Sequence, residues 1–278
     1  MQHSRFHICH KSHCEAVEYG EKRIAKQSFG MQNRVMMSTM HNVKVYTASS
    51  ACMEDERLFE AWLERVPQAR REKAVKPKNP KVRFESLAAG ALLTLALADY
   101  AAGADDLPSG AASLLKPDKV SDLRILENEH GRPYLPDLPD LHFSLSHSGD
   151  RVMCAVSRSP VGCDVEQAGE TEADRRRIGY VARCLTEAER ELSLADPASF
   201  YRIWTLKESF VKMTGQGLVI PLSSFEVSLD PVTIRQDIVS THIELKEFGR
   251  IGGCRYACVS QAAGIADEMI FVDLGNVL

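Results

Sequence analysis

Hydrophobic residues recur along this chain with two different periods, and the pattern predicts both strands and helices. Residues 43–47 predict a first strand. Residues 54–66 show helical spacing, and the expected buried face consists of Leu58, Phe59, Trp62 and Leu63. Residues 84–102 are apolar on nearly every side, so we expect a core helix that a sheet must cover.

Shorter strand-like segments follow this helix at close intervals. They comprise residues 123–126, 142–145, 152–157 and 160–166. The Gly-, Pro- and Asp-rich residues 103–118 predict a loop, and residues 146–150 predict a turn. The chain up to about residue 158 therefore contains one long helix and several strands.

The second half of the chain repeats this composition of elements without an obvious sequence repeat. Asp196 and Pro197 predict the start of a second long helix, which Gly215 and Gly217 end. The charged residues 170–183 predict a loop or a short helix, and Thr186 opens a helix that runs to about residue 194. Antiparallel strands are expected at residues 221–229, 243–248, 256–260 and 269–274.

These elements predict an α/β (α+β) fold in two halves, each a mainly antiparallel sheet around one long helix. We place the halves at residues 41–158 and 159–278. Residues 1–40 lack a sustained period, so we expect a disordered extension or an over-long translation start. Five residues in that segment raise the alternative of a zinc site, although their spacing fits no common zinc pattern: His7, Cys9, His10, His13 and Cys14.

Composition narrows the class of protein. Of the 278 residues, 44% are hydrophobic and 26% are charged, which is ordinary for a globular protein. The formal net charge of −4 argues against extensive nucleic-acid binding. The sequence has neither a run of about 20 apolar residues nor a secretory signal, so we expect no membrane span. Most cysteines stand singly within apolar runs, which favours reduced thiols in the cytoplasm.

One face of the second long helix carries three residues that could be chemical. Trp204, Glu208 and Lys212 follow one another at intervals of four, so they lie roughly on one side of the helix. An ordinary surface Glu–Lys pair, worth a few tenths of a kcal/mol, explains the same spacing equally well. The helix alone does not decide between the two interpretations.

A pair of acids in a predicted strand favours chemistry. Asp164 and Glu166 are two residues apart, so an extended strand points both to the same face. Like charges in a half-buried strand repel each other, and a divalent cation would stabilise them. Mg²⁺ prefers such hard oxygen ligands, and Glu208 would supply a third carboxylate.

Four motifs in order resemble the 4′-phosphopantetheinyl transferase superfamily, and most closely its longer, surfactin-synthetase-activating type. They are G-R-P at Gly131–Pro133, S-H-S at Ser146–Ser148, G-x-D-x-E at Gly162–Glu166 and W-x-x-K-E-x-x-x-K-x-x-G-x-G from Trp204 to Gly217. The resemblance spans roughly residues 43–278. It implies two pseudo-symmetric halves with the active site between them, in a single-chain pseudo-dimer that we expect to be monomeric.

The resemblance also implies an activity and a set of site residues. It implies transfer of the 4′-phosphopantetheine arm of coenzyme A to a serine of an acyl or peptidyl carrier protein. The metal ligands for Mg²⁺ would be Asp164, Glu166 and Glu208. Glu208 would accept the serine proton, and Lys212 would stabilise the leaving phosphate. The coenzyme A contacts would be Ser146, His147, Arg132, Arg83, Asp164 and Lys212.

Several of these residues have simpler explanations when each is taken alone. His147 could be an ordinary turn histidine, and the basic run over residues 65–83 could be a solvated loop. In the family, a residue of this basic region reaches the 3′-phosphate of coenzyme A, and Ser86 at a helix start could bind phosphate. Arg175–Arg177 are exposed candidates for contacting an acidic carrier protein.

Two other classes of function remain possible at this point. One is a catalytically silent relative that only binds carrier proteins, although the intact acids and Lys212 argue against it. The other is a Mg²⁺-dependent phosphotransferase acting on a nucleotide. That class offers no reason for the Ser146–His147 motif, and the chain has no G-x-x-x-x-G-K-[ST] loop.

Overall fold

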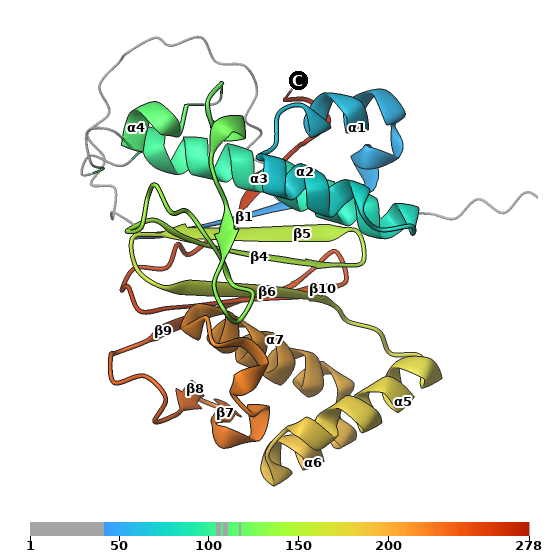
Figure 1. Ribbon diagram of the computed structural model, residues 1–278. Helices are drawn as coiled ribbons and strands as arrows, with labels where there is room; N and C mark the ends of the chain where they lie inside the picture. The colour runs from blue at the N-terminus through green and yellow to red at the C-terminus, as the bar shows by residue number, and fades with distance from the viewer. Residues whose placement is uncertain (1–41, 104–106, 108–110, 117, 278) are drawn as a thin grey trace, which may run out of the picture.

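The computed structural model describes residues 42–103, 107, 111–116 and 118–277. The predicted extension at residues 1–40, with its His and Cys residues, lies outside this range. Two sheets form the middle of the molecule, and helices cover the outer face of each sheet (Figure 1). The result is a four-layer arrangement of helix, sheet, sheet and helix. This confirms the predicted mixture of helices and mainly antiparallel sheets.

The first sheet has the strand order β11-β1-β5-β4. Its strands are β1 (Val43–Ser49), β4 (His142–Ser148), β5 (Arg151–Ser157) and β11 (Ile270–Val272). Four helices cover its outer face in Figure 1: α1 (Glu56–Leu63), α2 (Gln68–Val75), α3 (Pro80–Ala102) and α4 (Ala111–Leu114). Side chains of α3 such as Leu92 and Leu93 are completely buried against this sheet, together with Trp62 of α1.

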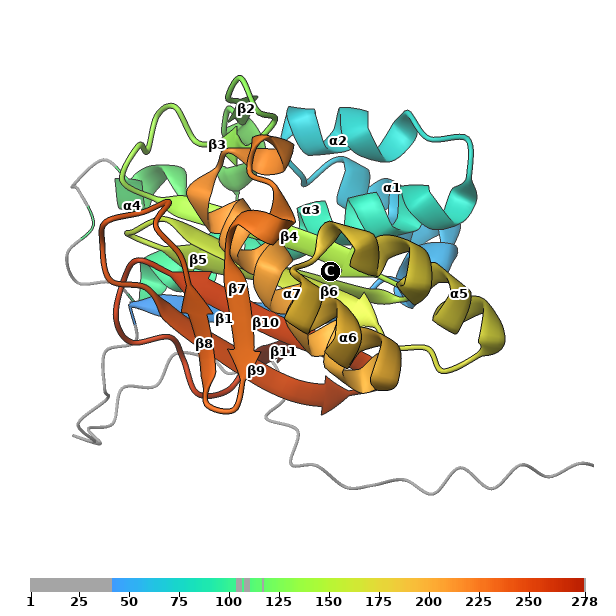
Figure 2. The ribbon, with the colours of Figure 1, turned by 90° about the horizontal axis from the view of Figure 1, so that it is seen from below.

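The second sheet has the order β6-β10-β9 and is fully antiparallel. Its strands are β6 (Val161–Gln167), β9 (Glu244–Ile251) and β10 (Cys254–Ser260). The long helix α7 (Pro197–Thr214) crosses its outer face beside α5 (Glu172–Val181) and α6 (Glu187–Ala195), as Figure 2 shows from below. Between the two sheets lies a buried layer to which Val43 and Val45 of β1 and Val165 of β6 contribute.

The remaining elements are short. Two small hairpins pair β2 (Leu126–Glu127) with β3 (Pro133–Tyr134) and β7 (Glu226–Leu229) with β8 (Val232–Arg235). Turns of 3₁₀ helix occupy Ala51–Glu54, Val120–Asp122, Ala182–Cys184, Gly217–Val219 and Leu222–Ser224.

The ends of the two long helices follow from local sequence. Asn79 caps α3 by accepting a hydrogen bond from the Lys81 amide at 2.9 Å, and Pro80 takes the first helical position. Asp196 caps α7 in the same way, through the amides of Ala198 and Ser199. By composition α3 could cross a membrane, but 72% of that window is buried within the fold, as in an ordinary core helix.

Some expected boundaries were wrong because longer-range packing decides them. The helix predicted from residue 84 begins at Pro80, so Ser86 lies inside the helix and not at its N-terminus. The basic run includes the helix α2 and is not a loop. Ser146–Ser148 belong to β4, and the turn is confined to Gly149 and Asp150. For residues 170–183, by contrast, the alternative of a short helix is confirmed: Glu172–Val181 form α5, which Thr171 and Asp174 cap through a capping box.

The C-terminal strand corrects the predicted division into halves. Residues 269–274 were expected to form an antiparallel strand within the second half. Instead β11 pairs parallel with β1, with Tyr46 opposite Ile270, so it extends the first sheet. The Trp62 indole also donates a hydrogen bond to the carbonyl of Leu274 at 3.1 Å. The end of the chain therefore joins the first half to the second.

Candidate active site

Serine side chains on β4 join the edges of the two sheets. Ser144 Oγ accepts a hydrogen bond from the Cys163 amide, and Ser148 Oγ accepts one from the Gln167 amide, each at 3.0 Å. Between them, Ser146 Oγ donates to Asp164 Oδ1 at 2.7 Å. Because alternate residues of a strand share one face, the three serines line one seam between β4 and β6.

The side chain of Lys212 reaches from α7 into this seam. Its Nζ lies 2.7 Å from Asp164 Oδ1, 2.9 Å from Ser146 Oγ and 3.2 Å from the carbonyl oxygen of Cys163. Burial alone would lower the pKa of Lys212, but the carboxylate of Asp164, aided by Glu208, outweighs it and raises that pKa. The ammonium is therefore charged at neutral pH and held against the acidic strand.

Gly162 explains how α7 comes so close to β6. A Cβ atom at this position would lie 1.9 Å from the Ser209 carbonyl oxygen and 2.4 Å from the Met213 amide nitrogen. Those are backbone atoms, so they have no flexible side chain that could move aside. The glycine of the G-x-D-x-E motif is thus required by the contact that brings Lys212 to Asp164.

The remaining two acids lie beside this cluster. Glu166 accepts hydrogen bonds from Ser148 Oγ at 3.0 Å and from the Trp204 indole at 3.2 Å. Burial, together with the charge of Asp164, raises the pKa of Glu166. Burial and the same Asp164 charge raise the pKa of Glu208, with a smaller contribution from Glu166. The predicted common face of Trp204, Glu208 and Lys212 does point towards Asp164 and Glu166.

The fit of a metal ion to these acids is mixed. Asp164 Oδ2 is buried and has no hydrogen-bond partner among the described residues, and the donors are hard carboxylate oxygens that suit Mg²⁺. In the described range, however, no three His, Cys, Asp or Glu side chains are gathered closely enough to hold a metal ion. Asp164 raises the pKa values of Glu166 and Glu208, but the three carboxylates do not converge on one point. Donor type and charge thus fit a divalent cation, whereas the side-chain arrangement would have to tighten around it.

A basic cluster adjoins the seam on the side of α3. His147 Nδ1 lies 3.2 Å from Glu85 Oε2, and Glu85 is buried. Burial, together with Arg70 and Lys212, lowers the pKa of His147, against the opposing effect of Glu85. Arg70 of α2 donates to the Ser86 carbonyl at 2.9 Å while its buried Nε has no partner in the described structure. Burial lowers the pKa of Arg70 to about 10.

Sequence reasoning did not single out Arg70. It lies within a run of similar basic residues, and only the packing of α2 against α3 brings it close to His147. The residue that was singled out, Arg83, instead places its guanidinium 5.1 Å from the ring centroid of Phe59. Among the described residues, no hydrogen bond or ion pair links Arg83 to His147.

Arg132 lies at the far end of α7. Its Nη1 donates to the carbonyl of Met213 at 2.9 Å, and its buried Nη2 has no partner in the described part of the chain. Of the expected coenzyme A contacts, the structure brings together Ser146, Asp164 and Lys212. His147 neighbours Ser146 on the same strand, whereas Arg132 contacts the helix end.

Lys207 and Trp204 of α7 support the site in different ways. Lys207 is completely buried in an ion pair with Glu189 at 2.8 Å, and it donates to the carbonyls of Leu222 and Phe225, each at 2.6 Å. Trp204 stacks on Phe200, with ring centroids 5.7 Å apart, and its indole donates a hydrogen bond to Glu166. Lys207 thus holds α7 in place.

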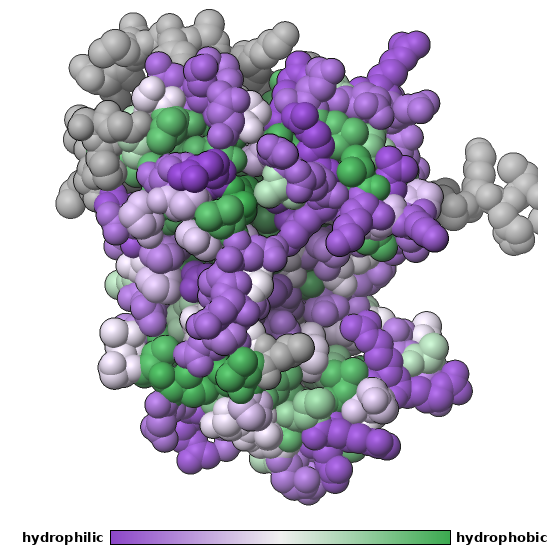
Figure 3. All heavy atoms as spheres, viewed as in Figure 1, coloured by the Kyte–Doolittle hydropathy of each residue, from purple (hydrophilic) through white to green (hydrophobic). Residues whose placement is uncertain are grey.

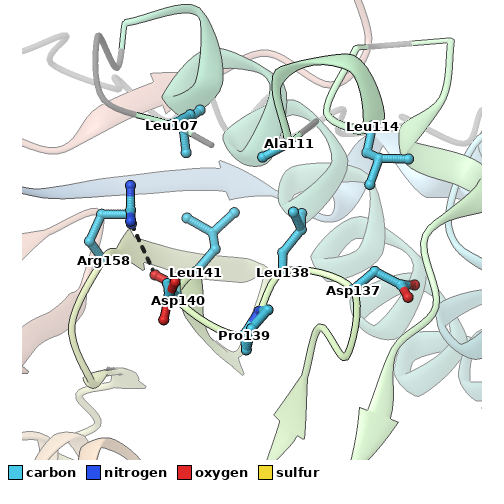
Figure 4. Close-up of a pocket in the computed structure, with 9 residues that line it drawn as sticks. All are labelled: Leu107, Ala111, Leu114, Asp137, Leu138, Pro139, Asp140, Leu141 and Arg158. Atoms are coloured by element: carbon cyan, nitrogen blue, oxygen red, sulfur yellow. Dashed lines mark hydrogen bonds between the residues drawn. The ribbon is translucent and has the colours of Figure 1, made fainter. Parts of the chain in front are cut away.

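The surface around the seam is hollowed. Figure 3 shows the depression between the helices of the first half and α5, bordered mainly by hydrophilic residues. From α5, Arg177 reaches to 3.8 Å from Glu166, so it differs from Arg175 and Arg176 in facing the acids. A separate apolar cavity of about 270 Å³ lies elsewhere, between Leu107, Leu114 and Leu141 (Figure 4). That cavity shares no lining residue with the seam.

Comparison with known proteins identifies the region that carries these acids. Residues 160–248 match the family model of the 4′-phosphopantetheinyl transferase superfamily. The predicted resemblance to this superfamily is thereby confirmed. The match includes Asp164, Glu166, Glu208 and Lys212, so it covers the second-half side of the seam.

Curated relatives match the same family. The chain is 40% identical over 114 residues to the 4′-phosphopantetheinyl transferase Sfp of Bacillus subtilis (strain 168), covering 39% of this chain and 49% of that protein. It is 34% identical over 99 residues to the 4′-phosphopantetheinyl transferase gsp of Aneurinibacillus migulanus, covering 36% and 41%. It is 37% identical over 97 residues to the 4′-phosphopantetheinyl transferase AcpT of Escherichia coli (strain K12), covering 33% and 48%. The chain spans about half the length of the curated relatives it matches.

Proposed function

We propose that this protein transfers the 4′-phosphopantetheine arm of coenzyme A to a serine of an apo carrier protein. The serine oxygen forms a bond to the pantetheine-bearing phosphorus of the pyrophosphate. The bond from that phosphorus to the bridging oxygen breaks, and adenosine 3′,5′-bisphosphate leaves. The observation that carries the proposal is the cluster of Lys212, Asp164 and Ser146 at the seam, with Glu166 and Glu208 beside it.

The pKa shifts of Glu208 and Lys212 suit the proton transfer and the charge development of this reaction. The raised pKa of Glu208 makes its carboxylate a better proton acceptor than an ordinary glutamate, so we assign it the serine proton. The raised pKa of Lys212 keeps its ammonium charged, so we assign it to the negative charge that grows on the leaving phosphate. Trp204 and Ser148 would fix Glu166 in orientation through their hydrogen bonds.

Asp164, Glu166 and Glu208 are the residues that would hold Mg²⁺. A bound Mg²⁺ would neutralise part of the pyrophosphate charge and make the phosphorus more electrophilic. Because Lys212 already neutralises Asp164 in part, we expect weak Mg²⁺ affinity until pyrophosphate supplies further oxygen ligands.

The basic cluster offers a place for the 3′-phosphate of coenzyme A. Arg70 lies near enough to His147 to lower its pKa, and the guanidinium groups of Arg70 and Arg83 each retain a buried Nε without a partner within the described structure. A planar guanidinium suits a phosphate group. Because Arg70 acts on His147 whereas Arg83 packs on the ring of Phe59, we assign the 3′-phosphate to Arg70 and His147 in preference to Arg83. The residues Ser146, Asp164 and Lys212 would contact the pyrophosphate end, and Arg132 remains a proposed contact.

Surface charge and the state of the cysteines support proposals for the partner protein and the cellular compartment. The exposed Arg175 and Arg176 of α5 offer a local positive surface for an acidic carrier protein, although the chain carries a net charge of −4. The six cysteines in the described range are free thiols, which fits a cytoplasmic enzyme. We further propose that the protein acts as a monomer, without binding nucleic acid or membranes.

Mass spectrometry of an apo carrier protein incubated with coenzyme A and Mg²⁺ tests this proposal. The expected result is a carrier that gains one phosphopantetheine, with adenosine 3′,5′-bisphosphate in the supernatant. A carrier that binds the protein without gaining mass would instead indicate a silent binding relative. Consumption of a nucleotide without carrier modification would indicate a different phosphotransferase.

A further inference from the structure

The hairpin between β2 and β3 has a turn that one side chain organises. Asn128 Oδ1 accepts hydrogen bonds from the amides of His130 at 3.0 Å and Arg132 at 2.8 Å. The backbone N–H of Asn128 in turn donates to the Arg132 carbonyl at 2.9 Å, and Gly131 supplies the required positive φ of 80°. Since Oδ1 faces the turn, the Nδ2 group of Asn128 points out of it.

The outward donors of this turn meet the end of α7. Asn128 Nδ2 donates to the Gly215 carbonyl at 3.0 Å, and Arg132 Nη1 donates to the Met213 carbonyl at 2.9 Å. The last carbonyls of a helix lack partners within the helix, and a cation near them is favourable. We call Asn128 and Arg132 together the hairpin latch, because they join the first half of the chain to this helix end.

The helix end is shaped for the latch. Gly215 has a φ of 72°, and a Cβ atom there would lie 2.6 Å from Arg132 Cδ. A Cβ atom on Gly217 would lie 3.3 Å from the His130 carbonyl oxygen. The two glycines that end α7 therefore admit the hairpin at close range, in addition to terminating the helix.

The latch acts on the turn of α7 that carries Lys212. Met213, whose carbonyl Arg132 binds, directly follows Lys212 in the chain, and the ammonium of Lys212 lies 2.7 Å from Asp164. A helix end that is free to fray moves its last side chains with it. The hydrogen bonds of Ser144 and Ser148 also join the halves, but they hold strand β6 and do not bind the last carbonyls of α7.

We propose that Asn128 is a positioning residue for phosphopantetheinyl transfer: through the hairpin latch it holds the last turn of α7 so that Lys212 stays aligned with Asp164. The inference rests on the proposed function, because Lys212 is assigned there to the leaving phosphate. The side chain of Asn128 contacts its own hairpin turn and the Gly215 carbonyl, so we assign it no direct part in the reaction. Its loss should therefore change the rate of the chemical step and leave carrier binding as it is.

The variant Asn128→Asp removes the hydrogen bond to Gly215 while keeping the hydrogen bonds that form the turn. The aspartate keeps the oxygen that accepts from His130 and Arg132, but it replaces the donor to Gly215 by a second oxygen that faces a carbonyl. Asn42→Asp is the matched control, because Asn42 Nδ2 donates to the carbonyl of Ala263 at 2.8 Å, at a place remote from the seam. Both changes add one negative charge and remove one amide-to-carbonyl hydrogen bond.

Single-turnover transfer, with enzyme in excess over carrier, gives the decisive comparison. We expect Asn128→Asp to slow transfer about fivefold with unchanged KM for the carrier, whereas Asn42→Asp keeps the wild-type rate. In a Lys212→Ala background, Asn128→Asp should have no further effect on the rate, since the two act through one group. Asn128→Ser, which keeps a turn-forming oxygen but cannot reach Gly215, serves if the aspartate variant does not fold.

A wild-type rate in a folded Asn128 variant would overturn the inference, and so would a full additional fivefold loss in the Lys212→Ala background. Failure of the proposed function is distinguishable, because the unmodified protein would then transfer nothing to any carrier. If the wild type transfers phosphopantetheine normally and Asn128→Asp transfers it at the same rate, the proposed function stands and the positioning role of Asn128 does not.

Discussion

Replacing Gly162 by alanine tests how closely α7 must approach β6. The added Cβ would meet the Ser209 carbonyl oxygen at 1.9 Å and the Met213 amide nitrogen at 2.4 Å. Ordinary contact begins near 3.4 Å, so the helix and strand must separate by about 1.5 Å. Lys212 lies 2.7 Å from Asp164, and a separation of that size would break this contact.

The expected losses of rate and of stability follow from that displacement. A misplacement of about 1 Å at an active site costs on the order of a hundredfold in rate. Overpacking of this kind also destabilises a fold by about 1–3 kcal/mol. We therefore expect Gly162→Ala to lower kcat by about a hundredfold and to lower Tm by several degrees, measured by carrier modification and by thermal unfolding.

Gly179→Ala is the matched control for this experiment. Gly179 lies within α5, and an added Cβ would meet Leu194 Cδ2 at 3.9 Å, which is ordinary contact. Because alanine favours helix, this variant should be as stable as the wild type or slightly more stable, with unchanged kcat. A folded Gly162→Ala protein with wild-type kcat and Tm would show that the site does not need this close approach of α7 to β6.

Three further predictions concern charge. Lys212→Ala should lower kcat by tenfold or more while Mg²⁺ still binds in a calorimetric titration; lost Mg²⁺ binding would contradict its assigned role. Glu189→Ala leaves the Lys207 ammonium buried without its partner, so urea unfolding should show a loss of about 3–5 kcal/mol; a loss below 1 kcal/mol would contradict the buried pair. Reversing Arg175 and Arg176 to Glu should raise KM for the carrier and weaken its salt dependence, with the affinity for coenzyme A unchanged; an unaltered KM would exclude this surface.

The pH dependence of turnover is a fourth consequence. Burial and the neighbouring acids raise the pKa of Glu208, and only its ionised form can accept the serine proton. Turnover should therefore fall as pH decreases through that raised pKa, above the range of an ordinary glutamate. The same sign predicts a stability effect: ionised Glu208 is disfavoured in the folded protein, so Glu208→Gln should raise Tm at neutral pH. A lower Tm in that variant would contradict this explanation.

The relative positions of the second-half residues, though not their assigned roles, could be predicted from the sequence because short-range rules determine them. Strand alternation places Asp164 and Glu166 on one face, and helical spacing aligns Glu208 with Lys212. The cap at Asp196 and the end at Gly215 likewise depend only on neighbouring residues. Chemistry carried by one strand and one helix is therefore accessible to pattern analysis.

Other features depend on contacts between segments far apart in the chain. Arg70 reaches the His147 cluster only because α2 packs on α3, and nothing in its local sequence separates it from the other basic residues. The pairing of β11 with β1 joins the two ends of the described chain, which a local pattern cannot encode. The role of Asn128 requires the hairpin and the end of α7 to meet, and these lie 87 positions apart.

Replacing Glu208 is the most direct test of whether the acids at the seam take part in the proposed transfer. The measurement is the mass of an apo carrier over time with coenzyme A and saturating Mg²⁺, for the wild type and for Glu208→Gln, with folding checked by circular dichroism. We predict that the wild type adds one phosphopantetheine and that folded Glu208→Gln does so at least a hundredfold more slowly, even in excess Mg²⁺. A folded Glu208→Gln protein that modifies the carrier at the wild-type rate would contradict the account.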